Sequence, residues 1–323
     1  MTTIADSFQE YLESVKYARS KNTFLAYSNA IKYFWLTLES NGINPDEDSI
    51  IKIHEEAISW FAYDLKSYSA ASEQLYITGV KGYFEFLLAE NLSTINLAKV
   101  RLLIKQRTRK PGKRLPQFPS DNILKIIEYL ETTSFAGITK VKDKLRAMRD
   151  KAFIITLADT GLRVHEACLL RRGDIDWNEG KALVIGKGNR QDVVRFSMRS
   201  QSALRAYLHE RGQLDGKSGK QLGSLPLFAR HDKGAGEKIK PITPTTGRNI
   251  VTASVRNILG EDDVGTITPH SFRHYFVTKV LTVTGNLKLA QNLARHKNIA
   301  VTQRYAHLSN DEMDKGYLEV FED

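Results

Sequence analysis

The sequence predicts a mainly α-helical protein with a small antiparallel β-sheet, built as an N-terminal helical bundle followed by an α+β domain. Apolar residues recur at helical spacing along most of the 323 residues, whereas a single region carries two short strand-like runs joined by turn residues. The length is typical of one large domain or two modest ones. We expect a helical domain over residues 1–100, a linker over 101–119 and a second domain over 120–323.

The first hundred residues carry four helical patterns. In each pattern, apolar side chains repeat every three or four residues and therefore share one helical face. The four faces consist of Ile4, Phe8, Leu12 and Val15; of Tyr27, Ile31, Phe34, Trp35 and Leu38; of Ile58, Phe61 and Leu65; and of Val80, Tyr83, Phe84, Leu87 and Leu88. Four helices with short connections predict a small helical bundle.

Residues 101–119 are basic and punctuated by proline. Seven of the fourteen residues 101–114 are basic and none is acidic, which predicts an extended interdomain linker. The charge density favours a segment that follows a phosphate backbone over a tether without a partner. The candidate DNA contacts are Arg101, Lys105, Arg107, Arg109, Lys110, Lys113 and Arg114 and, in the predicted hairpin turn, Arg190.

The second domain mixes helices with one hairpin. Helical patterns cover 120–132, 147–160, 199–210, 245–258, 270–282, 287–295 and 300–306. Two strand-like runs, 182–186 and 192–196, flank the turn residues 187–190 and predict an antiparallel pair. The stretch 212–240, rich in Gly, Lys and Ser, is predicted to be a surface loop.

Composition and charge limit the class of protein. No run of about 18 apolar residues is present, so no membrane-spanning helix is expected, and the N-terminus lacks the pattern of a secretion signal. The single cysteine, Cys168, excludes an internal disulfide and favours a reducing cytoplasm. The formal net charge is +10; residues 1–100 hold 8 Lys and Arg against 13 Asp and Glu, and the remainder holds 39 against 24. A polyanion is the natural partner of the basic part, although a basic surface that only aids solubility has the same charge.

Residues 160–167 form the first segment with chemical potential. Gly161 is suited to end one helix, and Arg163 is suited to begin the next, where its guanidinium and the free backbone N–H groups point at the same oxyanion. Glu166, one turn further on, is placed to orient that arginine. The alternative is a surface arginine in a local ion pair.

A second segment begins at Thr268 and Pro269, which together predict a helix start. His270 and Arg273 then share one face of the first turn, the outline of a phosphate site. His270 and His274 also have the spacing of a zinc-binding helix. The glutamate of the HExxH pattern is absent, however, so we favour the phosphate site over a metal site.

The remaining candidates are a lysine, a histidine and a tyrosine. Lys187 lies on a Gly-flanked turn, from which it can protonate an alkoxide leaving group, or simply be solvated. His296 ends a predicted helix, and Tyr305 follows nine residues later. Most tyrosines are packing residues, but the neighbouring Arg304 and His307 argue against deep apolar burial here.

Together these side chains supply each role in metal-free phosphoryl transfer. The two arginines neutralise non-bridging oxygens. A histidine manages the proton of the tyrosine hydroxyl, whose ordinary pKa is about 10 and which is a poor nucleophile until deprotonated. The lysine protonates the departing sugar oxygen. No carboxylate cluster accompanies them, so we expect neither a metal nor another cofactor.

In this order, the segments resemble the tyrosine recombinase (phage integrase) family, and most of all its Xer branch. TGLRVHE resembles the first arginine box, VIGKGNRQDVV the hairpin lysine, HSFRHYF the His-x-x-Arg-His box and ARHKNIAVTQRYAHL the final histidine and tyrosine. NTFLAYSNAIKYF and VKGYFEFLLAENLSTINLA resemble helices of the Xer core-binding domain, a SAM-like bundle. The resemblance implies a catalytic set of Arg163, Lys187, His270, Arg273, His296 and Tyr305, supported by Glu166 and His274.

The resemblance implies a site-specific DNA recombinase. Tyr305 would attack the scissile phosphate, leaving a 3′-phosphotyrosine and a free 5′-hydroxyl, and two successive exchanges would pass through a Holliday junction without ATP or metal. The partners would be double-stranded DNA with a specific recombination site and a homo-tetramer, or a hetero-tetramer with a related recombinase. The tail, 308–323, would dock on the next subunit, and the enzyme would be cytoplasmic and associated with the nucleoid.

One departure from the family pattern lies beside the final histidine. The family usually has Leu-Gly-His there, whereas Ala294 and Arg295 precede His296. We expect the arginine either to contact DNA or to face solvent. Two other functions share much of the residue set: a topoisomerase IB-like enzyme that nicks and reseals DNA as a monomer, and a catalytically silent DNA-binding regulator. The regulator has no reason to retain all the polar residues together.

Overall fold

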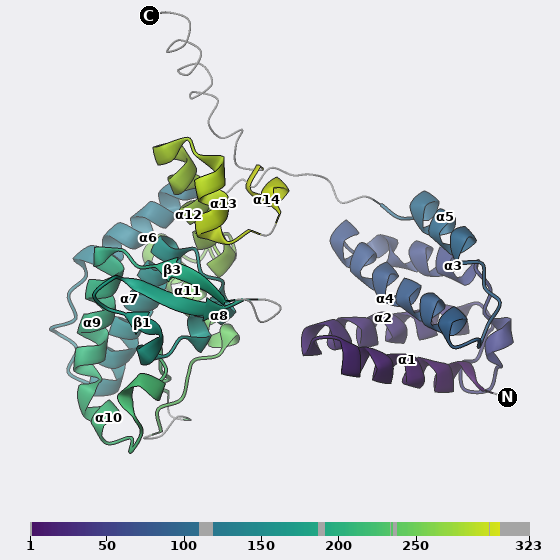
Figure 1. Cartoon of the computed structure of the whole chain (residues 1–323), viewed down its shortest axis with the longest axis horizontal. Coiled ribbons are helices and arrows are strands. Elements are labelled where there is room, and N and C mark those ends of the chain that lie inside the picture. Colours follow the sequence, from purple (N-terminus) through teal and green to yellow (C-terminus); the bar gives the residue numbers. More distant parts are fainter. Residues whose placement is uncertain are drawn as a thin grey trace, which may run out of the picture. The chain divides into compact units, whose positions relative to one another are not determined.

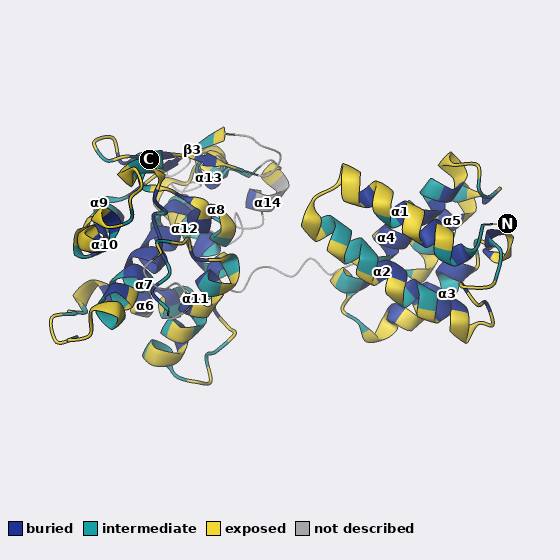
Figure 2. Cartoon of the chain, turned by 90° about the horizontal axis from the view of Figure 1, so that it is seen from below, coloured by how far each residue is buried: buried dark blue, intermediate teal, exposed yellow. Residues whose placement is uncertain are grey.

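The computed structural model describes residues 2–109, 119–186, 191–232, 234, 238–296 and 298–303 (Figure 1). The chain divides into two compact units, Met1–Arg114 and Leu115–Asp323. Each unit has its own buried core, which Figure 2 shows in dark blue. Within the described ranges, no helix is long and apolar enough to cross a membrane.

Within residues 2–109 the first unit is built of helices joined by loops. Its elements are α1 (Ile4–Ala18), α2 (Lys21–Ser40), the 3-10 turn η1 (Ile50–Lys52), α3 (Ala57–Asp64), η2 (Leu65–Ser67), α4 (Ala70–Ala89) and α5 (Leu97–Arg107). Side chains of Thr3, Ser20, Ser69 and Asn96 accept backbone N–H groups at four of the helix starts. The core is rich in aromatic rings, among them Phe34 and Phe61 with ring centroids 5.3 Å apart. The four predicted apolar faces supply most of this core.

The fifth helix, α5, corrects the predicted linker. The chain is helical as far as Arg107, although an extended segment was expected from residue 101. Val100, Leu103 and Ile104 form an apolar stripe that packs into the core of the first unit. The basic side chains of Arg101 and Lys105 lie on the exposed side of the same helix. The high charge of the segment concealed this amphipathic pattern.

The second unit combines helices with a three-stranded sheet. Its elements are α6 (Ser120–Thr132), α7 (Val141–Thr160), α8 (Val164–Leu169), η3 (Arg172–Asp174), β1 (Ile175–Asp176), β2 (Lys181–Ile185), β3 (Gln191–Arg195), α9 (Met198–Glu210), α10 (Gly212–Gly216), η4 (Leu222–Ser224), α11 (Pro244–Leu259), α12 (Pro269–Thr284), α13 (Leu287–Ala294) and α14 (Ile299–Gln303). The strands pair antiparallel in the order β1-β2-β3, and Ile185 faces Gln191 at the end of the β2–β3 pair. The predicted hairpin is confirmed, and the mainly helical fold class with it.

Part of the predicted surface loop 212–240 is buried. Leu225, Leu227 and Phe228 are fully buried in the core of the second unit. The guanidinium of Arg211, itself fully buried, donates hydrogen bonds to the Leu227 carbonyl at 3.0 Å and to the Pro226 carbonyl at 2.9 Å. The abundant Gly, Lys and Ser around this short apolar run concealed it.

Helix α7 positions the functional part of the second unit. It packs against α9 and α12, and its buried side chains include Phe153, Ile154 and Leu157. Its C-terminal end delivers the chain into the short turn before α8. Helices α12, α13 and α14 gather at one end of this unit (Figure 1). The segments that carry Arg163, His270, Arg273 and His296 therefore come from the ends of packed helices.

Candidate active site

The turn between α7 and α8 places Arg163. Gly161 has a φ of +59°, and a Cβ atom at this position would lie 2.5 Å from Cδ1 of Phe276, so conformation and space both require glycine. Arg163 is the N-cap residue of α8. Its backbone N–H donates to Oε2 of Glu166 at 2.9 Å, and its Nη1 donates to Oε1 at 2.8 Å. Glu166 therefore holds Arg163 in the way the sequence predicts, and the Arg163 side chain remains 40% exposed.

Arg273 joins two segments that lie far apart in the sequence. It lies in the first turns of α12 and is 2% exposed. Its guanidinium donates to the carbonyl of Gly161, just before Arg163, and to the carbonyl of Ala294, two residues before His296. Burial, and after it the charges of Arg163 and Arg295, lowers the pKa of Arg273 to about 9. This cluster holds more positive than negative charge, which a bound anion would relieve.

Two histidines share the start of α12. The helix begins at Pro269 after Thr268, whose backbone N–H donates to Oγ of Ser271 at 3.1 Å. The rings of His270 and His274 lie edge to face with centroids 4.3 Å apart. Partial burial, followed by the charges of Arg273 and Arg163, lowers the pKa of His270. A lowered pKa keeps this imidazole neutral at neutral pH and able to accept a proton.

His296 lies in the turn between α13 and α14. Its Nδ1 is 2.9 Å from Oγ1 of the buried Thr302, and its backbone N–H donates to the Gln291 carbonyl at 3.0 Å. Nε2 of Gln291 in turn donates to the His296 carbonyl at 3.1 Å. Burial, and then the charges of Arg273 and Arg163, lowers the pKa of His296 to about 4. The ring is therefore neutral at physiological pH, and its hydrogen bond to Thr302 orients it.

Arg295 is a member of this cluster that the sequence did not place correctly. Its side chain is only 4% exposed, and Nη2 donates to Oε2 of Glu166 at 2.8 Å. The expectation that it faces solvent is therefore wrong. Burial acts to raise the pKa of Glu166, but Arg295 and then Arg163 outweigh it, so the pKa lies below its ordinary value. The only sequence signal was the replacement of the glycine that the family usually has before its last histidine.

Several predicted residues lie outside the part of the chain that the structure describes. They are Lys110, Lys113, Arg114, Lys187, Arg190 and Tyr305. Lys187 and Arg190 belong to the connection between β2 and β3, and Tyr305 follows α14 by two residues in the sequence. The structure thus brings together Arg163, Glu166, Arg273 and His296. It also places His270 near enough for the charges of Arg273 and Arg163 to lower its pKa.

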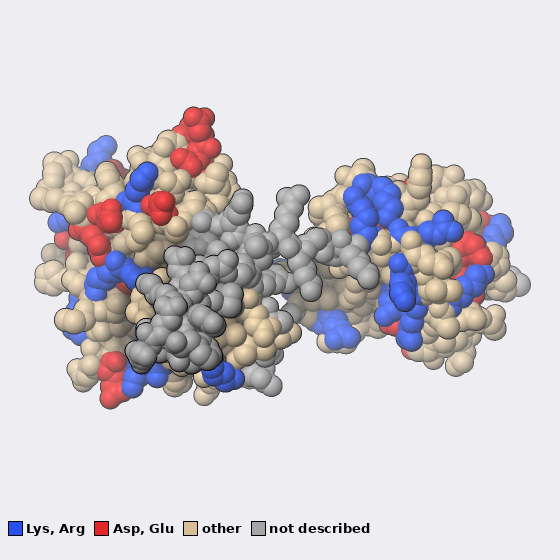
Figure 3. Space-filling model, turned by 90° about the horizontal axis from the view of Figure 1, so that it is seen from above, with Lys and Arg blue, Asp and Glu red and all other residues tan. Residues whose placement is uncertain are grey.

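The basic residues at the end of the first unit divide into two groups. Arg101, Lys105 and Arg107 are exposed on α5, and Lys and Arg side chains are prominent on the face of this unit seen in Figure 3. Arg109 instead binds the buried carboxylate of Glu73, with Nε donating to Oε2 at 2.6 Å. The prediction that all seven basic residues lie on an extended linker is therefore wrong for Arg101, Lys105 and Arg107, which lie on α5. Arg109 follows the helix, and its guanidinium is already bound to Glu73.

In the described ranges, no group of three or more His, Cys, Asp or Glu side chains is placed to hold a metal ion. The one cysteine, Cys168, is buried, and burial raises the pKa of its thiol to about 12. The side chains gathered around Arg273 are arginines and neutral imidazoles, which are suited to binding an anion and transferring protons.

Comparison with known proteins places this chain in one family. The profile of the Phage integrase family matches residues 117–312. The chain is 30% identical over 312 residues to the tyrosine recombinase XerC of Bacillus pumilus, covering 96% of this chain and 93% of the relative. It is 31% identical over 242 residues to XerC of Staphylococcus epidermidis, covering 75% and 72% respectively. The chain belongs to the phage integrase family of tyrosine recombinases. It is a site-specific recombinase that acts on DNA.

Solved structures share the fold over nearly the whole chain. The Tn1549 transposon integrase in complex with a circular intermediate DNA has a TM-score of 0.69 at 16% identity and covers 99% of this chain and 100% of that one. XerH bound to its palindromic difH substrate, in a post-cleavage complex, has a TM-score of 0.66 at 18% identity, covering 93% and 80%. A lambda integrase dimer bound to a COC′ core site has a TM-score of 0.64 at 17% identity, covering 94% and 77%. At these identities the likeness establishes the fold.

Proposed function

We propose that this recombinase cuts and rejoins DNA through a covalent bond between Tyr305 and a 3′-phosphate. The observation that supports the proposal most directly is the position of Arg273. Its two hydrogen bonds, to the carbonyls of Gly161 and Ala294, bring the Arg163 turn and the His296 turn to one place. A single phosphate bound there would meet arginine donors and a neutral imidazole together.

The proposed first step is an in-line displacement at phosphorus. The Tyr305 oxygen attacks, the new P–O bond forms, and the bond from phosphorus to the 5′-oxygen breaks. A neutral imidazole, that of His270 or His296, takes the phenolic proton. Lys187 gives a proton to the departing 5′-oxygen, while Arg163 and Arg273 stabilise the charge on the non-bridging oxygens.

The proposed second step reverses the first with a different nucleophile. A 5′-hydroxyl of the partner duplex attacks the phosphotyrosine and releases Tyr305. The phosphodiester energy is kept in the protein–DNA bond, so the proposal needs no ATP and no metal. Two such exchanges would produce and then resolve a Holliday junction.

The same proposal assigns roles to the parts of the chain. The helical unit would be the core-binding domain, the basic segment within 101–119 would follow the DNA backbone, and 120–323 would be catalytic. The active assembly would be a homo-tetramer, or a hetero-tetramer with a related recombinase, on double-stranded DNA with a specific recombination site. The DNA complexes of the relatives XerH and lambda integrase support a duplex partner. Since its substrate is DNA, we place the enzyme in the cytoplasm with the nucleoid.

The proposal is tested with Tyr305→Phe and a suicide substrate nicked close to the scissile phosphate. We expect the variant to bind DNA like the parent and to form no covalent adduct, because phenylalanine lacks the attacking oxygen. The matched control is Tyr129→Phe, which removes a hydroxyl from an exposed tyrosine on α6 and should leave the adduct intact. An adduct that persists in Tyr305→Phe would refute the assignment. Relaxation of arbitrary supercoiled plasmid without recombinant product would indicate a nicking and resealing enzyme instead.

A further inference from the structure

Arg295 has an unusual backbone conformation. Its φ is +57° and its ψ is +42°, in the left-handed region. Within the described ranges, Asn91 is the other non-glycine residue with a positive φ. Asparagine tolerates this region, whereas a long side chain with a Cβ atom is strained there. Such strain persists where the surrounding structure demands it, and it occurs most often at functional sites.

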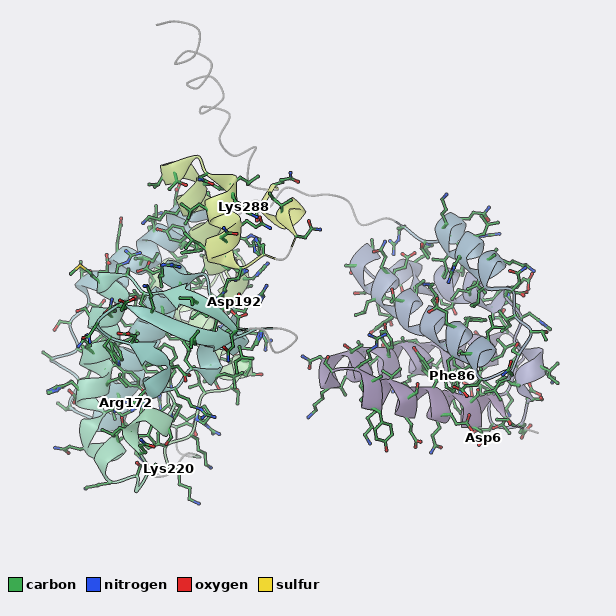
Figure 4. All side chains as sticks on the ribbon, in the orientation of Figure 1. Asp6, Phe86, Arg172, Asp192, Lys220 and Lys288 are labelled. Carbon is green, nitrogen blue, oxygen red and sulfur yellow. The ribbon has the colours of Figure 1, made fainter. Side chains whose placement is uncertain are left out.

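The side chain of Arg295 is also in an unusual position. It is 4% exposed, and its Nη1 atom is buried without a hydrogen-bond partner among the described residues. Burial lowers the pKa of Arg295; the charge of Glu166 opposes this and that of Arg163 adds to it. Asp192, at the start of β3 (Figure 4), also favours the charged form. A buried guanidinium with an unpaired donor is an unfavourable way to stabilise a fold.

The contact that Arg295 does make leads directly to Arg163. Its Nη2 holds Oε2 of Glu166 at 2.8 Å, and the same carboxylate accepts the Arg163 backbone N–H at 2.9 Å and its Nη1 at 2.8 Å. The Glu166 side chain is 1% exposed, so almost no water competes for it. The residue before Arg295 is held by Arg273 and the residue after it is His296.

A glycine at this position would make the same turn without strain and without a buried unpaired donor. Neither the αL turn nor the hydrogen bond from Arg273 to the Ala294 carbonyl needs the arginine side chain. What the side chain adds is the bond to Glu166. We propose that Arg295 is a positioning residue, which fixes Glu166, and through it the guanidinium of Arg163, relative to the turn that carries His296.

This proposal rests on the proposed function insofar as Arg163 is taken to bind the scissile phosphate. The test uses the full chain with Arg295→Gly, Arg295→Ala and Arg295→Lys, and measures single-turnover cleavage of the nicked suicide substrate at saturating protein beside equilibrium DNA binding. We expect Arg295→Gly to cleave at least about tenfold more slowly, the fold-change for about 1.4 kcal/mol, with DNA affinity within about twofold of the parent. Arg295→Lys should regain part of the rate, because an ammonium can still pair with Glu166.

The matched control is Arg256→Ala, which removes another arginine bound to a glutamate, Glu261, in an exposed pair at the end of α11. It should cleave like the parent. Comparison of Arg295→Gly with Arg295→Ala separates the effect of the backbone from that of the side chain. Both variants should cleave slowly, because both lose the bond to Glu166. The alanine variant should melt ~2–4 °C below the glycine variant, because alanine is strained at this positive φ. Cleavage by Arg295→Gly at the parental rate would overturn the proposal, as would a loss of rate matched by an equal loss of affinity.

A double-variant cycle tests the route through Glu166. If Arg295 acts through Glu166, Arg295→Gly combined with Glu166→Gln should cleave no more than about twofold slower than Glu166→Gln alone. If the rate losses of the two single variants multiply in the double variant, Arg295 does not act through Glu166.

An independent readout needs no reaction. The side-chain N–H signals of Arg163 in ¹⁵N-arginine-labelled protein should shift in Arg295→Gly and stay in place in Arg256→Ala. Unchanged Arg163 signals in Arg295→Gly would overturn the proposal, even if the cleavage chemistry proposed for Tyr305 fails its own test.

Discussion

The two units of this recombinase each contain a buried carboxylate that holds two cations, and the two groups differ in what remains free. In the first unit, the Glu73 group consists of Lys66, Glu73 and Arg109. In the second, the Glu166 group consists of Arg163, Glu166 and Arg295. The side chains of Glu73 and Glu166 are 0% and 1% exposed. In both groups the neighbouring cations lower the pKa of a carboxylate that burial alone would raise.

The donors of the Glu73 group are directed to neighbouring protein atoms. Glu73 accepts from Nζ of Lys66 at 2.8 Å and from the backbone N–H and Nε of Arg109 at 3.0 and 2.6 Å. Nη2 of Arg109 donates to the Tyr68 carbonyl at 2.6 Å, and Lys66 also donates to the Arg107 carbonyl at 2.6 Å. The group therefore attaches the chain after α5 to the bundle.

The Glu166 group leaves one buried donor without a partner. The side chains of Arg163, Lys66 and Arg109 are similarly exposed, at 40%, 40% and 43%. The groups differ at Arg295, whose buried Nη1 has no partner within the described residues. A polar network whose donors are paired contributes stability and rigidity, whereas an incompletely paired one is unfavourable unless a ligand completes it. The same carboxylate–cation arrangement therefore serves attachment in one unit and, by our proposal, phosphate binding in the other.

The largest effect that separates the two groups should come from Arg163→Ala. We expect cleavage to slow by about 10²–10³-fold, equivalent to about 3–4 kcal/mol, because a donor aimed at developing charge is lost. DNA binding should change little, and the melting temperature should fall because the buried Glu166 loses the hydrogen bond from Nη1 of Arg163. Single-turnover cleavage of the suicide substrate measures the rate. A cleavage rate within about threefold of the parent would mean that the Glu166 group, like the Glu73 group, only supports the fold.

A smaller effect, on stability and not on the cleavage rate, should come from Arg109→Ala. We expect the free energy of unfolding of the first unit to fall by about 1–3 kcal/mol, the range for a lost hydrogen bond to a charged group. Cleavage of bound substrate should remain at the parental rate. Denaturant unfolding measures the stability. Arg101→Ala is the matched control: Arg101 is 63% exposed in its pair with Glu85, and its loss should change stability by less than about 1 kcal/mol.

The stability difference between the parent and Arg109→Ala should also depend on pH. The lowered pKa of Glu73 means that its pairing stabilises the folded state above the unfolded-state pKa, about 4.3 for glutamate. This contribution disappears as the pH falls through the lower pKa of the folded state. Repeating the unfolding measurement from pH 7 downward should show the difference narrowing below about pH 4. A constant difference would mean that packing, and not the ion pair, is responsible.

The smallest effect concerns the salt dependence of DNA binding. Lys105 and Arg107 are exposed on α5, whereas the Arg109 guanidinium is occupied by Glu73. We expect Lys105→Ala or Arg107→Ala each to reduce the slope of log K against log[salt] by about one, since each lost phosphate contact releases about one fewer counterion. Arg109→Ala should leave the slope unchanged. Titrations between low and moderate salt measure the slope. If Lys105→Ala and Arg107→Ala keep the slope of the parent protein, α5 does not contact the DNA phosphates.

Much of the fold could be predicted from the sequence because its signals are local. Gly161 ends α7 with a positive φ, Thr268 and Pro269 begin α12, and the two predicted strand-like runs pair as β2 and β3. The fifth helix was missed because the basic side chains of α5 outweighed its apolar stripe. The buried part of 212–240 was missed because a short apolar run was surrounded by loop-forming residues.

The candidate site divides along the same physical line. The bond between Arg163 and Glu166 joins residues three apart at a helix start, and backbone geometry alone brings them together, so the local sequence was sufficient to predict it. Glu166 and Arg295 are 129 residues apart, and Arg273 and Gly161 are 112 apart. No local spacing brings such pairs together. The packing of α7, α8, α12 and α13 decided them, because only that packing buries the Arg295 guanidinium beside Glu166 and gives Arg163 a second, more distant support.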